Sequence, residues 1–374
     1  MKRCVLIVAV FFVLTANVYA LDSLNCREIG SWPFGPYCNA VVLDPNRHLA
    51  FVGSGGGVYV LDVSNPANPV KLSEAIHTRD VGRGLAQESN RLYIAGGKAG
   101  LEIWDVTSPT TPTRLGTCNT PDTALGVAVA GSYAYVADGY SGLRVIDVSD
   151  PANPKEVGYY DTPGSALGVA VAGSYAYVAD GFSGLRVIDV FHPAHPQEVG
   201  YYDTPGSALG VAVAGSYAYV ADFYSGLRVV DVSDPENPNE VGYCRTPDYA
   251  LGVAVAGSYA YVADYYGGLR VIDVSDPANP NEVGYCRTPG YAYGVAVAGS
   301  YAYVADDWVG LRVIDVFHPA HPNEVGYYDT RGTAYGVAVA GSYAYVADYD
   351  AGLRVIEFYG VGVEERFQRT ANGS

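Results

Sequence analysis

Short apolar stretches alternate with turn residues along most of the chain, and each stretch has the length of a β-strand. One representative segment contains four of them, at residues 126–130, 133–137, 143–148 and 156–160. Glycine, serine, aspartate, asparagine and proline fill the intervals, and these are the residue types that turns require. We therefore expect an all-β protein built from units of four strands, called a, b, c and d below.

The unit returns along the chain with a fixed spacing. The letters GVAVAGSYAYVAD begin at residues 126, 168, 210, 252, 294 and 336, which are 42 residues apart. A repeat of about 40 to 50 residues with several strands is typical of a β-propeller, in which each blade buries its apolar faces against its neighbours. Counting the units predicts an eight-bladed β-propeller of four-stranded blades, with seven blades as the alternative.

The order of the strands within a blade follows from the size of their side chains. Strand a consists of glycine, alanine and valine, so we expect it innermost, where the blades crowd around the axis. Residues 26–32 resemble a strand d that precedes the first blade, whereas the last unit ends near Phe358 without one. The N-terminal strand is therefore predicted to complete the last blade, since a closed ring has no exposed sheet edges.

Strand c carries the motif that connects the chain to a known family. It reads GLRVIDVS at residues 142–149 and recurs with small changes in the other units. This motif resembles the LVIVD repeat family, and the resemblance covers nearly the whole chain after its first residues. It implies an exported bacterial or archaeal β-propeller, and it implies no settled biochemical activity.

The two ends of the chain lie outside the repeats. Residues 1–20 combine Lys2 and Arg3 with an apolar run and a small residue, Ala20, as a signal peptide does. We expect the propeller to span residues 21–359, and residues 360–374 to form a C-terminal tail or the stub of a linker. The protein is then exported to the periplasm, the cell surface or the medium, and no other stretch is apolar enough to span a membrane.

The composition supports a well-packed but acidic scaffold. Hydrophobic residues make up 49% of the chain, with 34 Tyr, 45 Gly and 22 Pro, so core material and turns are both abundant. The formal net charge is −17. Such a surface repels phosphate backbones, so nucleic acid is excluded as a partner class.

The turn between strands b and c differs from one unit to the next, although the rest of the repeat is copied almost letter for letter. This b–c turn and the linker from strand d into the next blade share one face of a propeller, which we call the variable rim. We expect a partner to bind there, because its aromatic and acidic side chains suit a glycan or a protein surface. The candidate ligand-binding residues are Tyr140, Phe182, Tyr224, Tyr249, Tyr266, Tyr291, Asp307 and Trp308.

An aspartate ends strand b in six units and raises a weaker hypothesis. A ring of carboxylates around an axis is able to hold Ca²⁺, but the first two units carry Ser54 and Gly96 at this position and interrupt the ring. Aspartate also caps turns through its side chain. We predict no cofactor and no metal, and keep a Ca²⁺ site as the alternative. Its ligands would be Asp138, Asp180, Asp222, Asp264, Asp306 and Asp348.

Every acidic residue or histidine that stands out has a counterpart one repeat away, whereas a catalytic residue is needed once. We therefore predict a non-enzymatic binding or interaction propeller whose partner is a protein or a glycan at the cell surface. A polysaccharide lyase or hydrolase that uses Asp306, Asp307 and Trp308 on the same rim is the enzymatic alternative. An architectural protein of the cell envelope is the third hypothesis, and the oligomeric state stays open.

Overall fold

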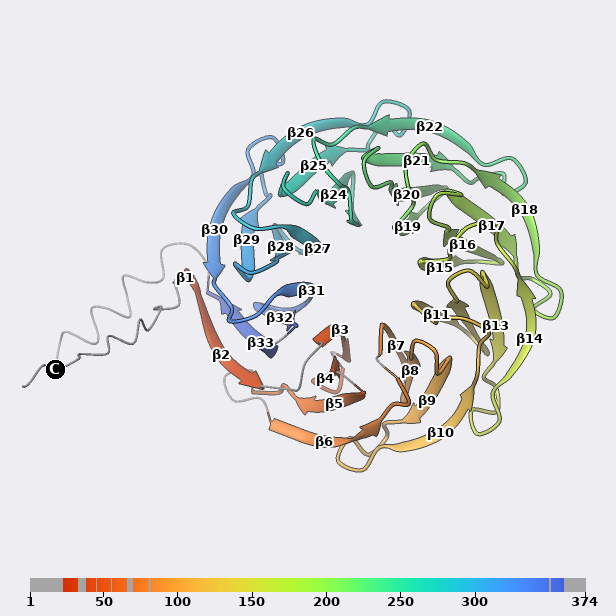
Figure 1. Cartoon of the computed structure of the whole chain (residues 1–374). Coiled ribbons are helices and arrows are strands. Elements are labelled where there is room, and N and C mark those ends of the chain that lie inside the picture. The colour runs from red at the N-terminus through yellow and green to blue at the C-terminus, as the bar shows by residue number, and fades with distance from the viewer. Residues whose placement is uncertain are drawn as a thin grey trace, which may run out of the picture.

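The computed structural model describes residues 23–32, 38–44, 46–54, 56–65, 70–80, 82–349 and 351–359. These residues form eight antiparallel sheets arranged in a ring (Figure 1). The all-β, eight-bladed prediction is confirmed, and seven blades are excluded. The predicted signal peptide, residues 1–20, and the tail, residues 360–374, lie outside the described residues. No helix in the described ranges is long and apolar enough to cross a membrane.

Each blade has its strands in the order a, b, c, d from the centre of the ring to its perimeter (Figure 1). The a strands are β3 (Cys38–Asp44), β7 (Gly84–Glu88), β11 (Gly126–Ala130), β15 (Gly168–Ala172), β19 (Gly210–Ala214), β23 (Gly252–Ala256), β27 (Ala292–Ala298) and β31 (Ala334–Ala340). The b strands are β4 (Leu49–Ser54), β8 (Arg91–Ala95), β12 (Tyr133–Ala137), β16 (Tyr175–Ala179), β20 (Tyr217–Ala221), β24 (Tyr259–Ala263), β28 (Tyr301–Asp306) and β32 (Tyr343–Asp348). We number the blades 1 to 8 in this order.

The remaining strands form the outer half of each blade. The c strands are β5 (Gly57–Asp62), β9 (Leu101–Asp105), β13 (Leu143–Asp147), β17 (Leu185–Asp189), β21 (Leu227–Asp231), β25 (Leu269–Asp273), β29 (Leu311–Asp315) and β33 (Gly352–Phe358). The d strands of blades 1 to 7 are β6 (Val70–His77), β10 (Thr113–Cys118), β14 (Lys155–Tyr160), β18 (Gln197–Tyr202), β22 (Asn239–Cys244), β26 (Asn281–Cys286) and β30 (Asn323–Tyr328). Their position at the perimeter and that of the small-residue strands at the centre are as the sequence predicts.

The N-terminal segment closes the ring. Strand β2 (Cys26–Trp32) pairs with β33 as strand d of blade 8, and the short β1 (Ser23–Leu24) pairs with β30 of blade 7. The Cys26 side chain is buried, and Arg27 forms an ion pair of 2.6 Å with Glu357. The first described strands therefore join the last two blades, which confirms the predicted closure.

The hydrophobic core lies between the blades. Strands β12 and β13 each bury four of their five residues, so both of their faces are covered. Leu143 and Val145 of blade 3 share one cluster with Val178 and Ile188 of blade 4, and equivalent clusters recur at the other seams. A single blade therefore has no core of its own, as expected for a repeat protein.

A glycine in strand d allows each blade to approach the next one. Gly200 of blade 4 faces the turn between β21 and β22 of blade 5, where a Cβ atom would lie 2.4 Å from the Pro235 oxygen. Gly116, Gly158, Gly242 and Gly284 meet the equivalent proline turns. At the seam of blades 7 and 8 the N-terminal segment takes the place of this turn, with the Leu24 oxygen 2.9 Å from the Cβ position of Gly326.

A methyl group at the seam should destabilise the ring. We expect Gly200→Ala to lower the free energy of unfolding by about 1 to 3 kcal/mol, because the new Cβ atom overpacks the contact with backbone. Gly210→Ala is the matched control, since its Cβ atom would meet nothing closer than the Leu251 oxygen at 3.6 Å. Chemical denaturation of both variants measures the difference, and equal stabilities would contradict the tight seam.

Removal of the N-terminal strands should open the ring. A chain that lacks residues 23–32 leaves the edge of β33 unpaired, and an unpaired edge is a template for aggregation. We expect this chain to lose the cooperative thermal transition and to aggregate, as measured by circular dichroism and light scattering. A soluble monomer with an unchanged melting temperature would show that blade 8 does not need β2.

Candidate functional site

The b–c turns and the linkers lie together on one face of the ring. Gly139 in the b–c turn of blade 3 forms a β-bridge with Ala166 in the linker that enters blade 4, and the same pairing recurs between Phe223 and Ala250. Each turn thus contacts the linker that leads to the next blade. From the turn of blade 2 to the linker into blade 8, the turns and linkers of the variable rim are joined in one surface.

The aspartate at the end of strand b fixes this surface to the blade. Asp138 accepts hydrogen bonds from the Thr120 hydroxyl at 2.6 Å and from the Asp122 backbone N–H at 3.0 Å, and both donors belong to the linker that enters its own blade. Asp180 uses Thr162 and the Gly164 N–H in the same way. The six aspartates are fully buried. Their carboxylates therefore act as anchors for the linkers.

A buried arginine from strand c accompanies each aspartate. Arg144 lies with its Nε 3.8 Å from Asp138 and places its guanidinium carbon 4.7 Å from the centre of the Tyr159 ring. Its Nη2 donates to the Ser141 carbonyl and to the Asp161 carboxylate, both at 2.6 Å. Arg144 thus connects Asp138 at the end of strand b, Tyr159 of strand d and Asp161 of the linker that leaves blade 3.

These contacts bear on the hypothesis of a calcium ring. The carboxylate of Asp138 is already used by a threonine hydroxyl, a backbone N–H and an arginine. Among the residues that the structure describes, no three of the His, Cys, Asp and Glu side chains lie close enough together to hold a metal ion. The geometry of Asp138, Asp180, Asp222, Asp264, Asp306 and Asp348 is that of separate anchors, one in each of blades 3 to 8.

Aromatic side chains form a continuous cluster on the rim of blades 5, 6 and 7, which lie side by side in Figure 1. Phe223 stacks on Tyr249, and Tyr265 stacks on Tyr291, with ring centres 4.2 Å apart in both pairs. The rings of Tyr291 and Trp308 also meet in a T-shaped contact, with their centres 4.5 Å apart. We call this cluster the aromatic arc; it consists of Phe223, Tyr224, Tyr249, Tyr265, Tyr266, Tyr291 and Trp308.

The backbone of the arc adopts a conformation that glycine favours. The first position after the aspartate has φ near +55° in blades 3 and 4, where it is Gly139 and Gly181. In blades 5, 6 and 7 the same position holds Phe223 (φ 44°), Tyr265 (φ 40°) and Asp307 (φ 52°). Side chains in this region cost about 1 to 3 kcal/mol each and concentrate at functional sites.

The structure brings together five of the eight predicted ligand-binding residues, namely Tyr224, Tyr249, Tyr266, Tyr291 and Trp308. Tyr140 and Phe182 are highly exposed, at 81% and 78%, and make no ring contact with the described aromatic residues. Asp307 is only 7% exposed, and burial together with the charge of Asp306 raises the pKa of its carboxyl group. The eight side chains therefore do not form one contacting cluster, and their role in ligand binding stays a prediction.

Sequence reasoning missed part of the arc. Phe223 and Tyr265 hold its stacked pairs together, and Tyr293, Tyr335 and Tyr349 continue it toward blade 8. The signal for the first two is visible in the repeat, because each is a bulky residue at a position where Gly139 and Gly181 stand in other units.

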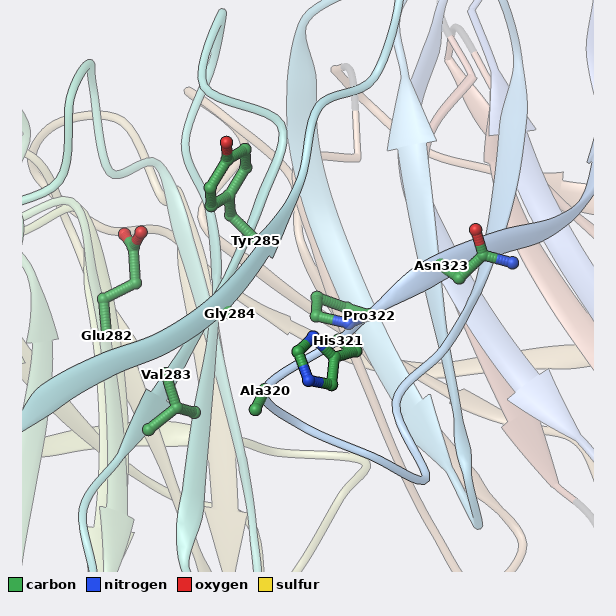
Figure 2. A pocket seen from close by; sticks show the side chains of 8 residues that line it. All are labelled: Glu282, Val283, Gly284, Tyr285, Ala320, His321, Pro322 and Asn323. Atoms are coloured by element: carbon green, nitrogen blue, oxygen red, sulfur yellow. The ribbon is translucent and has the colours of Figure 1, made fainter.

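Concave features of a different kind lie at the perimeter. One groove has a volume of about 530 Å³. Glu282 and Tyr285 of strand β26 line it on one side, and His321 and Pro322, from the turn before β30, line it on the other (Figure 2). Equivalent grooves of about 440 Å³ and 470 Å³ occur at the seams of blades 3 and 4 and of blades 4 and 5. Because these grooves recur with the repeat, we assign them to blade packing.

Blade 6 departs from the anchoring pattern beneath the arc. Thr246 donates to the Asp248 backbone oxygen at 3.3 Å, and the Oδ1 atom of Asp264 has no hydrogen-bond donor among the described residues. The Nη2 atom of the buried Arg270 is likewise without a partner. Burial raises the pKa of Asp264 to about 6, against the opposing effect of Arg270.

The raised pKa values predict how stability depends on pH. Burial raises the pKa of Asp264 and of its five counterparts in the other blades. The folded protein therefore binds protons more tightly than the unfolded chain, and stability falls as the pH rises from about 4 through 6. We expect a higher melting temperature at pH 5 than at pH 7.5, measured by calorimetry.

Two variants of blade 6 test whether Asp264 contributes to this dependence of stability on pH. Asp264→Asn should reduce the difference in melting temperature between pH 5 and pH 7.5, because it removes the group with the most clearly raised pKa. Asp273→Asn should leave the difference unchanged, since the hydrogen bond from Ser275 lowers the pKa of Asp273. A melting temperature that falls on acidification from pH 7.5 to pH 5 would contradict the assignment.

Solved structures share the fold at low sequence identity. Sqt1 from Chaetomium thermophilum, bound to the N-terminus of the ribosomal protein L10, has a TM-score of 0.75 and 16% identity, with 88% of this chain and 99% of that chain covered. BamB from Moraxella catarrhalis has a TM-score of 0.66 and 14% identity, with 89% and 98% covered. The computationally designed Ika8 protein has a TM-score of 0.75 and 8% identity, with 88% and 99% covered.

At the level of sequence, no curated protein matches the chain. The model of the LVIVD repeat matches it at residues 49–75, 87–120, 122–162, 163–204, 205–246, 247–288, 289–330 and 331–357. These matches cover most of the propeller and follow one another from blade to blade. The chain therefore belongs to the LVIVD repeat family.

Proposed function

We propose that this chain is an exported, non-enzymatic interaction propeller whose aromatic arc binds another protein. The observation that carries the proposal is the left-handed backbone at Phe223 and Tyr265. Gly139 and Gly181 show that the fold accepts glycine at this position without strain. The bulky residues are costly for the blade, and their side chains build the arc, so binding is the gain that explains them.

The way in which the rings pack favours a protein over a glycan. A sugar stacks on a free aromatic face, but the faces within the Phe223–Tyr249 and Tyr265–Tyr291 pairs cover each other. The arc instead offers ring edges, tyrosine hydroxyl groups and the exposed Trp308. Tyrosine and tryptophan are enriched among the residues that dominate protein interfaces.

Two further considerations support this proposal. Asp306 is held by the Gly290 backbone N–H at 3.0 Å, and the neighbouring Asp307 is buried, so neither presents a carboxylate to a substrate in the way that the enzymatic alternative requires. Sqt1, which shares the fold, is bound to a segment of another protein in its solved structure. Export rests on the N-terminal residues 1–20 and their resemblance to a signal peptide.

A pair of substitutions tests the arc. Peptides are selected from a random library on the immobilised protein, and a glycan array is probed in parallel. We expect Tyr266→Ala together with Trp308→Ala to weaken the binding of the selected peptides at least about tenfold, because exposed Tyr and Trp side chains are typical hot spots. Fluorescence anisotropy measures the dissociation constants.

Two exposed aromatic residues outside the arc provide the matched control. Tyr140→Ala together with Phe182→Ala removes two aromatic residues that are more exposed than any in the arc but lie outside it. These substitutions should leave peptide binding within about twofold. An equal loss in both double variants, or capture of glycans without any peptide, would refute the arc as a protein-binding site.

A further inference from the structure

The linkers beside the aromatic arc carry arginine where other blades carry aspartate. Asp161, Asp203 and Asp329 stand directly before the threonine that recurs in the linkers, here those that follow blades 3, 4 and 7. The same position in blades 5 and 6 holds Arg245 and Arg287, in the sequence Cys-Arg-Thr-Pro. Each replacement shifts the local charge by two units in the positive direction, within a chain whose net charge is −17.

The aspartate has a structural task that the arginine cannot perform. Asp161 and Asp203 form ion pairs of 2.6 Å and 2.7 Å with the buried arginines Arg144 and Arg186. In blade 6 the corresponding partner is missing, and the Nη2 atom of Arg270 has no hydrogen-bond acceptor although the residue is only 3% exposed. A buried donor without an acceptor is destabilising.

Three free cations therefore lie on one sector of the rim. Arg245, Arg287 and Arg331 are exposed, and none of their guanidinium groups forms a hydrogen bond or an ion pair with the described part of the chain. Arg245 shares a linker with Tyr249 of the arc, and Arg287 shares one with Tyr291. Apart from the buried anchors Asp222, Asp264 and Asp306, the described carboxylates in the turns and linkers of this sector are Asp248, the buried Asp307 and Asp329, which is paired with Arg312 at 2.7 Å.

We propose that the aromatic arc and these three arginines together bind an acidic segment of a partner protein. The inference rests on the proposed function of the arc and adds the chemistry of its partner. Arginine forms bidentate hydrogen bonds with carboxylates, and arginine, tyrosine and tryptophan together are the residue types of binding hot spots. Charge complementarity then accounts for two arginines that stand where the linkers after blades 3 and 4 have the aspartates paired with Arg144 and Arg186.

A variant with aspartate in place of Arg245 and Arg287 tests the effect on binding without impairing the fold. The double variant Arg245→Asp, Arg287→Asp recreates the Asp-Thr-Pro sequence of the linkers that follow blades 3 and 4, and it supplies Arg228 and Arg270 with the missing carboxylate. We expect its melting temperature to equal or exceed that of the unchanged protein. Its affinity for an acidic peptide should fall at least about tenfold, because attraction is replaced by repulsion.

The probes are three fluorescein-labelled 15-residue peptides, (Glu-Glu-Phe)₅, (Gln-Gln-Phe)₅ and (Lys-Lys-Phe)₅, together with sodium polygalacturonate as an acidic polysaccharide. The unchanged protein should bind the glutamate peptide at least about tenfold more tightly than the glutamine peptide, and added salt should reduce the preference. The double variant should lose this preference. Equal binding of the Glu and Gln peptides, an undiminished preference in the variant, or tighter binding of polygalacturonate would overturn the proposal.

The aromatic variant distinguishes failure of this inference from failure of the proposed function. Tyr266→Ala with Trp308→Ala should weaken the glutamate and the glutamine peptide alike, since both contain phenylalanine. If the arc variant reduces binding while the arginine variant does not, the arc is a binding site for a neutral segment and the acidic partner is wrong. If neither variant changes the affinities, both proposals fail.

Discussion

Burial between neighbouring blades is the constraint on which the rest of this structure depends. Strands b and c are covered on both faces, and each hydrophobic cluster takes its residues from two adjacent blades. A blade is therefore stable only when both neighbours are in place. The pairing of β2 with β33 completes blade 8 and closes the ring. The tight contacts between strand d glycines and the next blade's prolines fix the spacing that this burial needs.

In blades 3 to 8 the buried aspartate and arginine hold the conserved scaffold in place beneath the turns that vary. Asp138 anchors the linker through Thr120, and Arg144 joins the outer strand to the same region. With the ends of the b–c turn fixed in this way, the residues between them are free to change without disturbing the blade. Blades 5 and 6 carry aromatic residues in the left-handed backbone of this turn, and blade 6 also leaves two buried polar atoms unpaired.

The repeat made most of the fold predictable, and it limited what could be said of the site. The spacing of 42 residues and the unmatched strand at residues 26–32 were sufficient to predict eight blades and their closure. The contacts of the arc depend on how side chains from adjacent blades meet across a linker, and no single repeat contains that information. Tyr140 and Tyr266 occupy equivalent positions, but only Tyr266 has an aromatic neighbour, Tyr291, to bond at 2.6 Å.

The pairing of β2 with β33 also orders the events of folding. Arg27 and Glu357 are 330 positions apart, so the first strand to be synthesised has no partner until nearly the whole chain is available. Blades 1 to 7 each contain four strands that are consecutive in the chain and are able to assemble on one another in sequence, whereas blade 8 requires the pairing of strands from opposite ends of the chain. Until that moment strand β2 has an unpaired backbone edge, which is able to pair with other chains.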